Sequence, residues 1–114
     1  MYNEMISILH SAGVGQHYRG YSYFIKAVEM AAENPDRLQN IRRDIYQPIA
    51  TSFQTTFSNV EKNLRTVRDV FIKNGGDKLL SEIIGSPFWL HNKPYPRELI
   101  ELFAIYLTDK IRLN

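Results

Sequence analysis

The sequence predicts an all-α protein, a compact bundle of about six helices that contains a helix-turn-helix. Two observations predict this fold class. Apolar residues recur at three- and four-residue steps along most of the chain, which is the spacing of helices that bury one face. Most glycines and prolines stand between these periodic runs, where helices are expected to begin and end.

Length and composition set further limits. A chain of 114 residues, 44% of them hydrophobic, fits a single globular domain over residues 1–114. The absence of cysteine excludes disulfides and thiolate metal sites. No apolar run is long enough to cross a bilayer, and the first ten residues lack the features of a signal peptide. We therefore expect a cytoplasmic protein that makes no membrane contact.

The first third of the chain should form two helices. Residues 2–11 are amphipathic and are followed by two glycines, which are typical helix ends. A longer helix is expected from about His17 to Glu33, with Gly20 weakening its first turn. The Asn34-Pro35-Asp36 sequence should end that helix and place Pro35 at the opening of the next one.

The next run should continue as helix up to residue 53. Its inward positions follow three- and four-residue steps, namely Leu38, Ile41, Ile45, Ile49 and Phe53. Pro48 lies inside the run, so a kink or break is expected near Tyr46 and Gln47.

Residues 49–65 read as a short helix, a polar turn and a second helix. The small side chain of Ala50 would let the second helix cross close by. Ser58 and Glu61 match a capping box that would start the second helix, and Thr56 is a competing cap. The turn carries Gln54 where many such turns carry glycine. This pattern is typical of a helix-turn-helix whose second helix enters the DNA major groove, although an ordinary helical hairpin gives the same spacing.

The second helix has two distinct faces. Its inward stripe consists of Val60, Leu64, Val67 and Phe71. Its outward face carries Ser58, Lys62, Arg65, Thr66 and Asp69. Residues 58–73 hold four basic and two acidic residues, and their net charge of +2 equals that of the whole chain. Such a face can bind phosphates and present polar groups to base edges, although a solvated surface helix can also be basic.

The last third should contain two more helices. One spans residues 77–84 and is closed by Gly85, and the other runs from about Arg97 to Leu113. The inward positions of the last helix would be Leu99, Leu102, Phe103, Tyr106, Leu107 and Ile111. Residues 86–96 should form a loop that contains Trp89. The indole either fills the gap beside the last helix or contacts a partner, and we favour the first interpretation.

Several ordered motifs resemble the C-terminal effector domain of the stage-zero sporulation protein A family. They are Ile8-Leu9-His10-x-x-Gly13-Val14, His17-Tyr18-Arg19-Gly20-Tyr21-x-Tyr23, Ile45-Tyr46-x-Pro48-Ile49-Ala50, Thr55-Thr56-x-Ser58-x-Val60-Glu61-Lys62-x-Leu64-Arg65, Lys93-Pro94 and Asp109-Lys110-Ile111-Arg112-Leu113. Together they cover nearly the whole chain. The resemblance implies an all-helical effector domain of a transcription regulator that binds promoter elements in double-stranded DNA.

Carried over by position, the resemblance implies a set of DNA-binding residues. They are Ser58, Asn59, Glu61, Lys62 and Arg65. We expect three further DNA-binding residues, namely Thr66, Arg68 and Lys93. Glu61 would accept from a cytosine amino group and Lys62 would donate to a guanine edge. Ser58, Arg65 and Arg68 would hold phosphates. The family also implies head-to-tail pairs on adjacent DNA elements and RNA polymerase as a possible partner, with no cofactor.

This chain departs from the family in four respects. Asn59 and Lys62 stand where the family typically has arginine, which predicts a different or weaker base preference. Phe57 replaces a proline at the helix start. The last helix is about one turn longer, which affects any inherited dimer contact. The effector takes up all 114 residues, so no receiver domain is expected in them. The sequence fits both an excised piece and a stand-alone relative.

Other functions receive less support from the sequence. His10, His17 and His91 lack the spacing of a helical metal-ligand pair, so no metal site is expected. No phosphate-binding glycine loop or nucleophile motif is present, which argues against an enzyme. The alternative is a helical protein-interaction module that keeps the fold but has lost specific operator binding.

Overall fold

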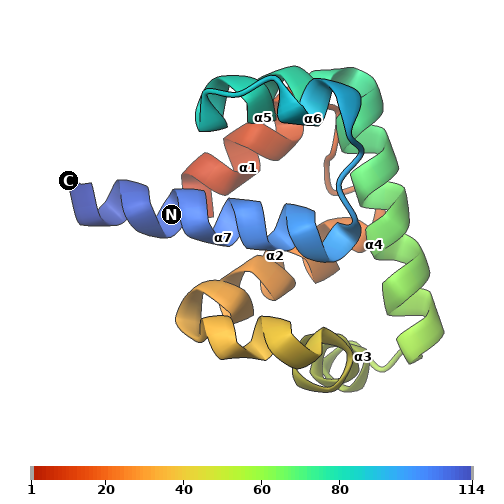
Figure 1. Cartoon of the computed structure of the whole chain (residues 1–114). Helices are drawn as coiled ribbons and strands as arrows, with labels where there is room; N and C mark the ends of the chain where they lie inside the picture. Colours follow the sequence, from red (N-terminus) through yellow and green to blue (C-terminus); the bar gives the residue numbers. More distant parts are fainter. Residues whose placement is uncertain (1, 114) are drawn as a thin grey trace.

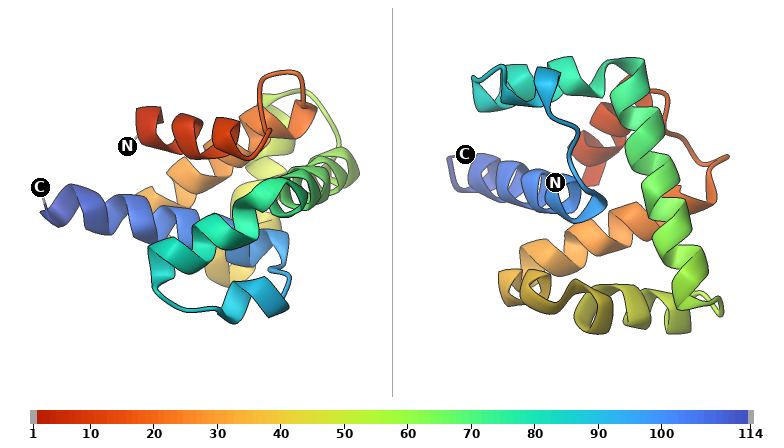
Figure 2. Two further views of the ribbon diagram at one scale, coloured as in Figure 1. Left: turned by 90° about the horizontal axis from the view of Figure 1, so that it is seen from above. Right: turned by 45° about the vertical axis from the view of Figure 1, so that its right-hand side comes forward.

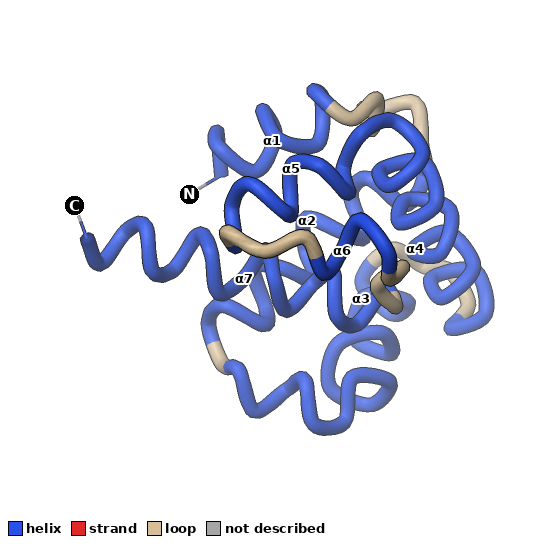
Figure 3. Tube along the Cα trace, turned by 45° about the horizontal axis from the view of Figure 1, so that its top comes forward, coloured by secondary structure: helices blue, strands red, loops and turns tan. Residues whose placement is uncertain are grey.

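The computed structural model describes the backbone of residues 2–113 and the side chains of residues 3–108. This part of the chain is all-helical, with short loops and no strand (Figures 1 and 3), which confirms the predicted fold class. The Cα radius of gyration is 13.3 Å, the value expected for a folded chain of this length. The described residues contain seven α-helices rather than about six, because the expected loop before the last helix includes one helical turn.

The helices follow one another with few extended residues between them. In chain order they are α1 (Tyr2–Ser11), α2 (Arg19–Glu33), a 3₁₀ segment η1 (Pro35–Asn40), a π-helical segment η2 (Arg42–Tyr46), α3 (Gln47–Ser52), α4 (Phe57–Phe71), a π-helical segment η3 (Ile72–Gly76), α5 (Asp77–Ile84), α6 (Phe88–His91) and α7 (Pro96–Leu113). The predicted bounds of α1 and α5 are therefore confirmed. The second helix begins two residues later than expected, because residues 15–18 form a turn closed by the Tyr18 N–H to the Gly15 carbonyl at 3.1 Å.

Helix α2 lies at the centre of the molecule and packs against both α4 and α7 (Figure 2). Phe103 of α7 links these elements, since its ring lies 5.0 Å from the ring of Phe24 and 5.5 Å from that of Phe71. Gly20 lies where α2 crosses α4, and a Cβ there would be 2.3 Å from the backbone oxygen of Asn63. The absence of a side chain at Gly20 therefore allows the close crossing of the two helices.

The helical run through Pro48 changes geometry without breaking. At the expected position, between Tyr46 and Gln47, a π-helical turn gives way to α-helix, and both residues keep right-handed helical dihedral angles. The Gln47 N–H bonds to the Arg42 carbonyl, one residue further back than in an α-helix. Because proline has no N–H and crowds the preceding turn, this widened turn accommodates Pro48.

The segment before α7 packs against the core through Trp89. Trp89 is half-buried against the core, as the gap-filling interpretation expects, and Phe88 packs edge-on against it with ring centroids 4.7 Å apart. Leu99, Phe103 and Leu107 of α7 are buried as predicted. Leu102 and Tyr106 are partly buried, and the predicted inward position of Ile111 lies outside the described side chains.

Candidate nucleic-acid interface

The turn between α3 and α4 is fixed by local hydrogen bonds. The Thr55 N–H bonds to the Ala50 carbonyl at 2.9 Å, and the Thr56 hydroxyl accepts from the Asn59 N–H at 3.1 Å. Thr56 is thus the N-cap of α4. The predicted capping box of Ser58 and Glu61 is wrong, because the helix begins at Phe57 and both residues already lie inside it.

Gln54 has a positive φ of 53°, the left-handed conformation that glycine adopts more readily. The chain leaves the helical path just before it, since α3 ends at Ser52. Phe53 therefore does not continue the inward stripe as predicted, and its side chain is 43% exposed. Its ring still contacts the ring of Tyr23 in an edge-to-face arrangement, with centroids 5.1 Å apart.

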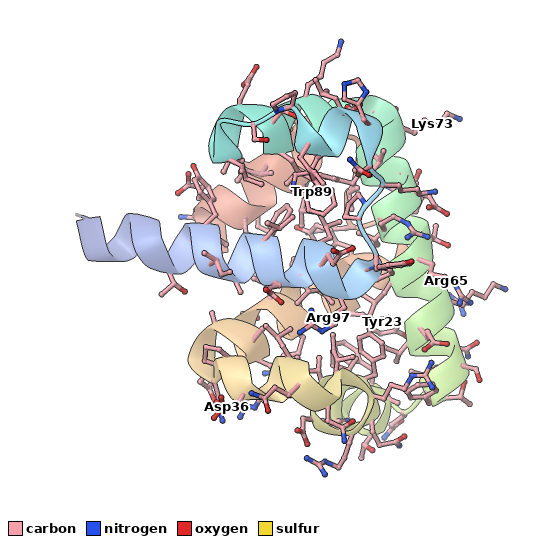
Figure 4. All side chains as sticks on the ribbon, viewed as in Figure 1. Tyr23, Asp36, Arg65, Lys73, Trp89 and Arg97 are labelled. Carbon is pink, nitrogen blue, oxygen red and sulfur yellow. The ribbon has the colours of Figure 1, made fainter. Side chains whose placement is uncertain are left out.

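Helix α4 is anchored by one stripe and exposed along the other. Val60, Leu64, Val67 and Phe71 are at most 1% exposed, which confirms the predicted inward face. The side chains on the opposite face are exposed, namely Ser58, Asn59, Lys62, Arg65 and Thr66. The helix runs along one edge of the molecule (Figure 2), and Arg65 extends away from the body (Figure 4). In the described part of the chain these five side chains are therefore open to solvent.

Glu61 lies between two arginines at the start of α4. Its carboxylate is 3.7 Å from an Nη of Arg42, which belongs to η2, and 3.9 Å from an Nη of Arg65. The Arg42 guanidinium also lies 5.8 Å from the centroid of the Phe57 ring. Behind this group, burial and the nearby Glu61 charge raise the pKa of Tyr46 to about 12. Sequence reasoning missed Arg42, because no periodicity relates it to α4.

A second polar cluster ties the segment before α7 to the middle of α4. Arg68 donates to the Pro94 carbonyl at 3.1 Å and to Asp69 at 2.7 Å, and its side chain is only 14% exposed. The Nζ of Lys93 lies 2.7 Å from the same Asp69 carboxylate. Burial opposes the ionisation of Asp69, but the hydrogen bonds that its carboxylate accepts from Lys93 and Arg68 have the larger effect. They hold the pKa of Asp69 below its usual value. The cluster places Lys93 beside α4.

The sequence profile described as "Sporulation initiation factor Spo0A C terminal" matches residues 5–107 of the chain. The chain belongs to this family. Its members are the DNA-binding effector domains of the sporulation initiation factor. The family is a family of DNA-binding domains and not of enzymes. Membership confirms the resemblance drawn from the motifs.

In this Spo0A C-terminal domain the eight candidate DNA-binding residues fall into three groups. Five share the exposed face of α4, and Glu61 lies at its edge, half-buried between two arginines. Arg68 is mostly buried and bonded to backbone, while Lys93 comes from the segment before α7. Asp69, which brings Arg68 and Lys93 together, was expected only as an outward residue, and no local pattern signals its bridging position.

Within the described residues of the Spo0A C-terminal domain, no three His, Cys, Asp or Glu side chains come together as metal ligands would. His10 stacks with Tyr21, with ring centroids 6.0 Å apart, and His17 packs on Tyr18 at 4.3 Å. None of the helices described is both long and apolar enough to span a bilayer.

Proposed function

We propose that the chain binds specific sequences in double-stranded DNA, with α3, the turn at residues 53–56 and α4 acting as a helix-turn-helix. The exposed polar face of α4, opposite a fully buried stripe, is the observation that carries the proposal. A helix held in this way can enter the major groove without disturbing the core. Family membership supports DNA binding in general, and the operator-specific part is our inference.

Each exposed side chain suits a particular part of the duplex. Lys62 and Asn59 can contact guanine and adenine edges respectively, and Glu61 can accept from a cytosine amino group. Ser58, Thr66 and Arg65 suit phosphates or sugars, which fix the position of the helix without reading sequence. Lysine makes a single point contact where arginine would make two parallel bonds, so base discrimination by Lys62 should be modest.

Arg68 and Lys93 act as a pair in this proposal. Because its guanidinium already bonds to Asp69 and to the Pro94 carbonyl, Arg68 holds the segment before α7 against α4. Lys93 is 55% exposed beside that helix and can bind a phosphate there. Head-to-tail pairing of two domains on DNA and contact with RNA polymerase are further proposals that rest on the family resemblance alone.

Selection of bound duplexes from a random pool, followed by binding at several salt concentrations, tests the proposal. The wild type should enrich a defined sequence and weaken steeply as salt rises. Arg65→Ala should weaken binding to all duplexes and reduce the slope of log K against log salt by about 0.9, the value for one lost phosphate contact. Lys62→Ala should lose preference at one base pair, at a cost of about 1–3 kcal/mol.

Lys78→Ala is a matched control, since it removes an exposed charge on α5. Its affinity and salt slope should equal those of the wild type. If the wild type enriches no sequence and binds no duplex at low salt, the protein-interaction alternative is favoured instead.

A further inference from the structure

Arg42 precedes α3 in the chain yet lies beside the first turns of α4. Both of its neighbours described above belong to α4, namely the Glu61 carboxylate at 3.7 Å and the Phe57 ring at 5.8 Å. The side chain is 72% exposed. A cation from η2 therefore joins the surface that we propose meets DNA.

The contact between Arg42 and Glu61 is loose. A charge-assisted hydrogen bond between nitrogen and oxygen is about 2.7–2.9 Å long, so a separation of 3.7 Å leaves the guanidinium donors without a close partner in that carboxylate. Exposed ion pairs of this kind contribute little to stability, because water screens the two charges. Moving Arg42 from Glu61 to another anion therefore costs little.

The adjacent residue Arg43 has the opposite arrangement. Its Nε and an Nη donate to the two oxygens of Asp44 at 2.8 and 3.1 Å, in the two-pronged geometry that uses the guanidinium fully. Its side chain is 73% exposed, nearly the same as that of Arg42. The two arginines thus differ in partner and in position relative to α4, but not in charge or exposure.

The charge around Glu61 is also unbalanced. One carboxylate faces two guanidinium groups, those of Arg42 and Arg65, so the cluster keeps a net positive charge. It lies close to the N-terminal end of α4, where the helix dipole adds a partial positive charge. Both the net charge of the cluster and the partial charge of the helix end attract an approaching phosphate.

We infer that Arg42 is a further phosphate-binding residue, supplied from the segment that precedes the helix-turn-helix, and that it exchanges Glu61 for a DNA phosphate when α4 enters the groove. This inference rests on the proposed function. The exchange removes one cation from Glu61, whose carboxylate is then better able to accept a hydrogen bond from a base amino group.

The test measures the affinity of the full chain for its selected duplex over a range of salt concentrations. Arg42→Ala and Arg42→Gln should each weaken binding several-fold at low salt and reduce the log–log salt slope by about 0.9. Arg42→Lys should keep most of the slope because it keeps the charge. Arg43→Ala, the matched control, should bind like the wild type.

Duplexes with single neutral methylphosphonate substitutions then locate the contact. At one position the substitution should reduce the affinity of the wild type but leave the affinity of Arg42→Ala unchanged. In that variant the guanidinium that would bind this phosphate is already missing. The inference is overturned if Arg42→Ala and Arg42→Gln keep the wild-type salt slope, or if Arg43→Ala loses as much affinity and slope as they do. It is also overturned if every methylphosphonate substitution reduces the affinities of the wild type and of Arg42→Ala equally. A wild type without salt-dependent duplex binding overturns the proposed function and this inference together, whereas unchanged arginine variants overturn the inference alone.

Discussion

Replacing Gly20 by alanine tests the packing that positions α4. The added Cβ would lie 2.3 Å from the backbone oxygen of Asn63 and 2.6 Å from a methyl group of Val67. Unstrained carbon–oxygen contacts are about 3.3–3.6 Å. The carbonyl belongs to the backbone of α4 and cannot rotate away, so α2 and α4 must separate by about 1 Å, a gap that forfeits a quarter to a half of the local dispersion energy.

The change in the free energy of unfolding caused by Gly20→Ala follows from two opposing effects. Overpacking a tight interface costs about 1–3 kcal/mol, and the immobile backbone atom places this case near the upper limit. Alanine is about 1 kcal/mol better than glycine inside a helix, which offsets part of that cost. The free energy of unfolding should therefore fall by about 2 kcal/mol, and the melting temperature by about 10 °C.

Urea unfolding followed by far-UV circular dichroism measures this change. Ser22→Ala is the control, because Ser22 is exposed on the same helix and its replacement changes helix propensity without adding a contact. The control should be as stable as the wild type or slightly more so. A Gly20→Ala variant at least as stable as the wild type would show that the close crossing does not depend on glycine and would refute this reasoning.

Three further predictions concern the turn, a buried tyrosine and the core. Gln54→Gly should raise stability by about 0.5 kcal/mol in urea unfolding, because relief of left-handed strain exceeds the entropy cost of glycine; a loss would mean that the Gln54 side chain makes a stabilising contact. Burial raises the folded-state pKa of Tyr46 from 10 to about 12, so stability present below pH 10 should be lost as pH rises to 12, by about 2–3 kcal/mol. Tyr46→Phe has no ionisable hydroxyl, so its free energy of unfolding should not fall in this way between pH 10 and pH 12. Equal falls in the wild type and the variant would show that Tyr46 is not the group responsible. Val60→Asp should unfold the domain, since it buries an unpaired charge at a fully buried position; a folded variant by circular dichroism would contradict the inward stripe.

Much of the secondary structure could be predicted because its causes are local. The bounds of α1 and α5 follow from an amphipathic run and a closing glycine, and the stripe from Val60 to Phe71 follows from helical periodicity. The start of α4 does not follow from local sequence alone, because Thr56 and Ser58 both offer a capping hydroxyl. The turn decides between them, since its path brings the Thr56 hydroxyl to the Asn59 N–H.

The composition of the candidate site was harder to predict. Sequence motifs predicted the α4 residues and Lys93 as DNA-binding, which stays a prediction, and they indicated the family, which the sequence profile confirms. They did not indicate Arg42, which reaches Glu61 only because η2 folds back beside α4. Nor did they indicate that Arg68 would bond to Pro94, since the two residues are far apart in the chain and meet only in the folded protein.

The sequence by itself determined the all-helical class, the bounds of α1 and α5, the buried stripe of α4 and the family, because periodicity, caps and ordered motifs are properties of neighbouring residues. Only the tertiary structure decided which cations surround Glu61, that Asp69 joins Arg68 to Lys93, and that Phe53 leaves the inward stripe. The physical reason is that ion pairs and exposure depend on distances between elements. Those distances are set by the packing of α2, α4 and α7 around a common core, and no single segment encodes them.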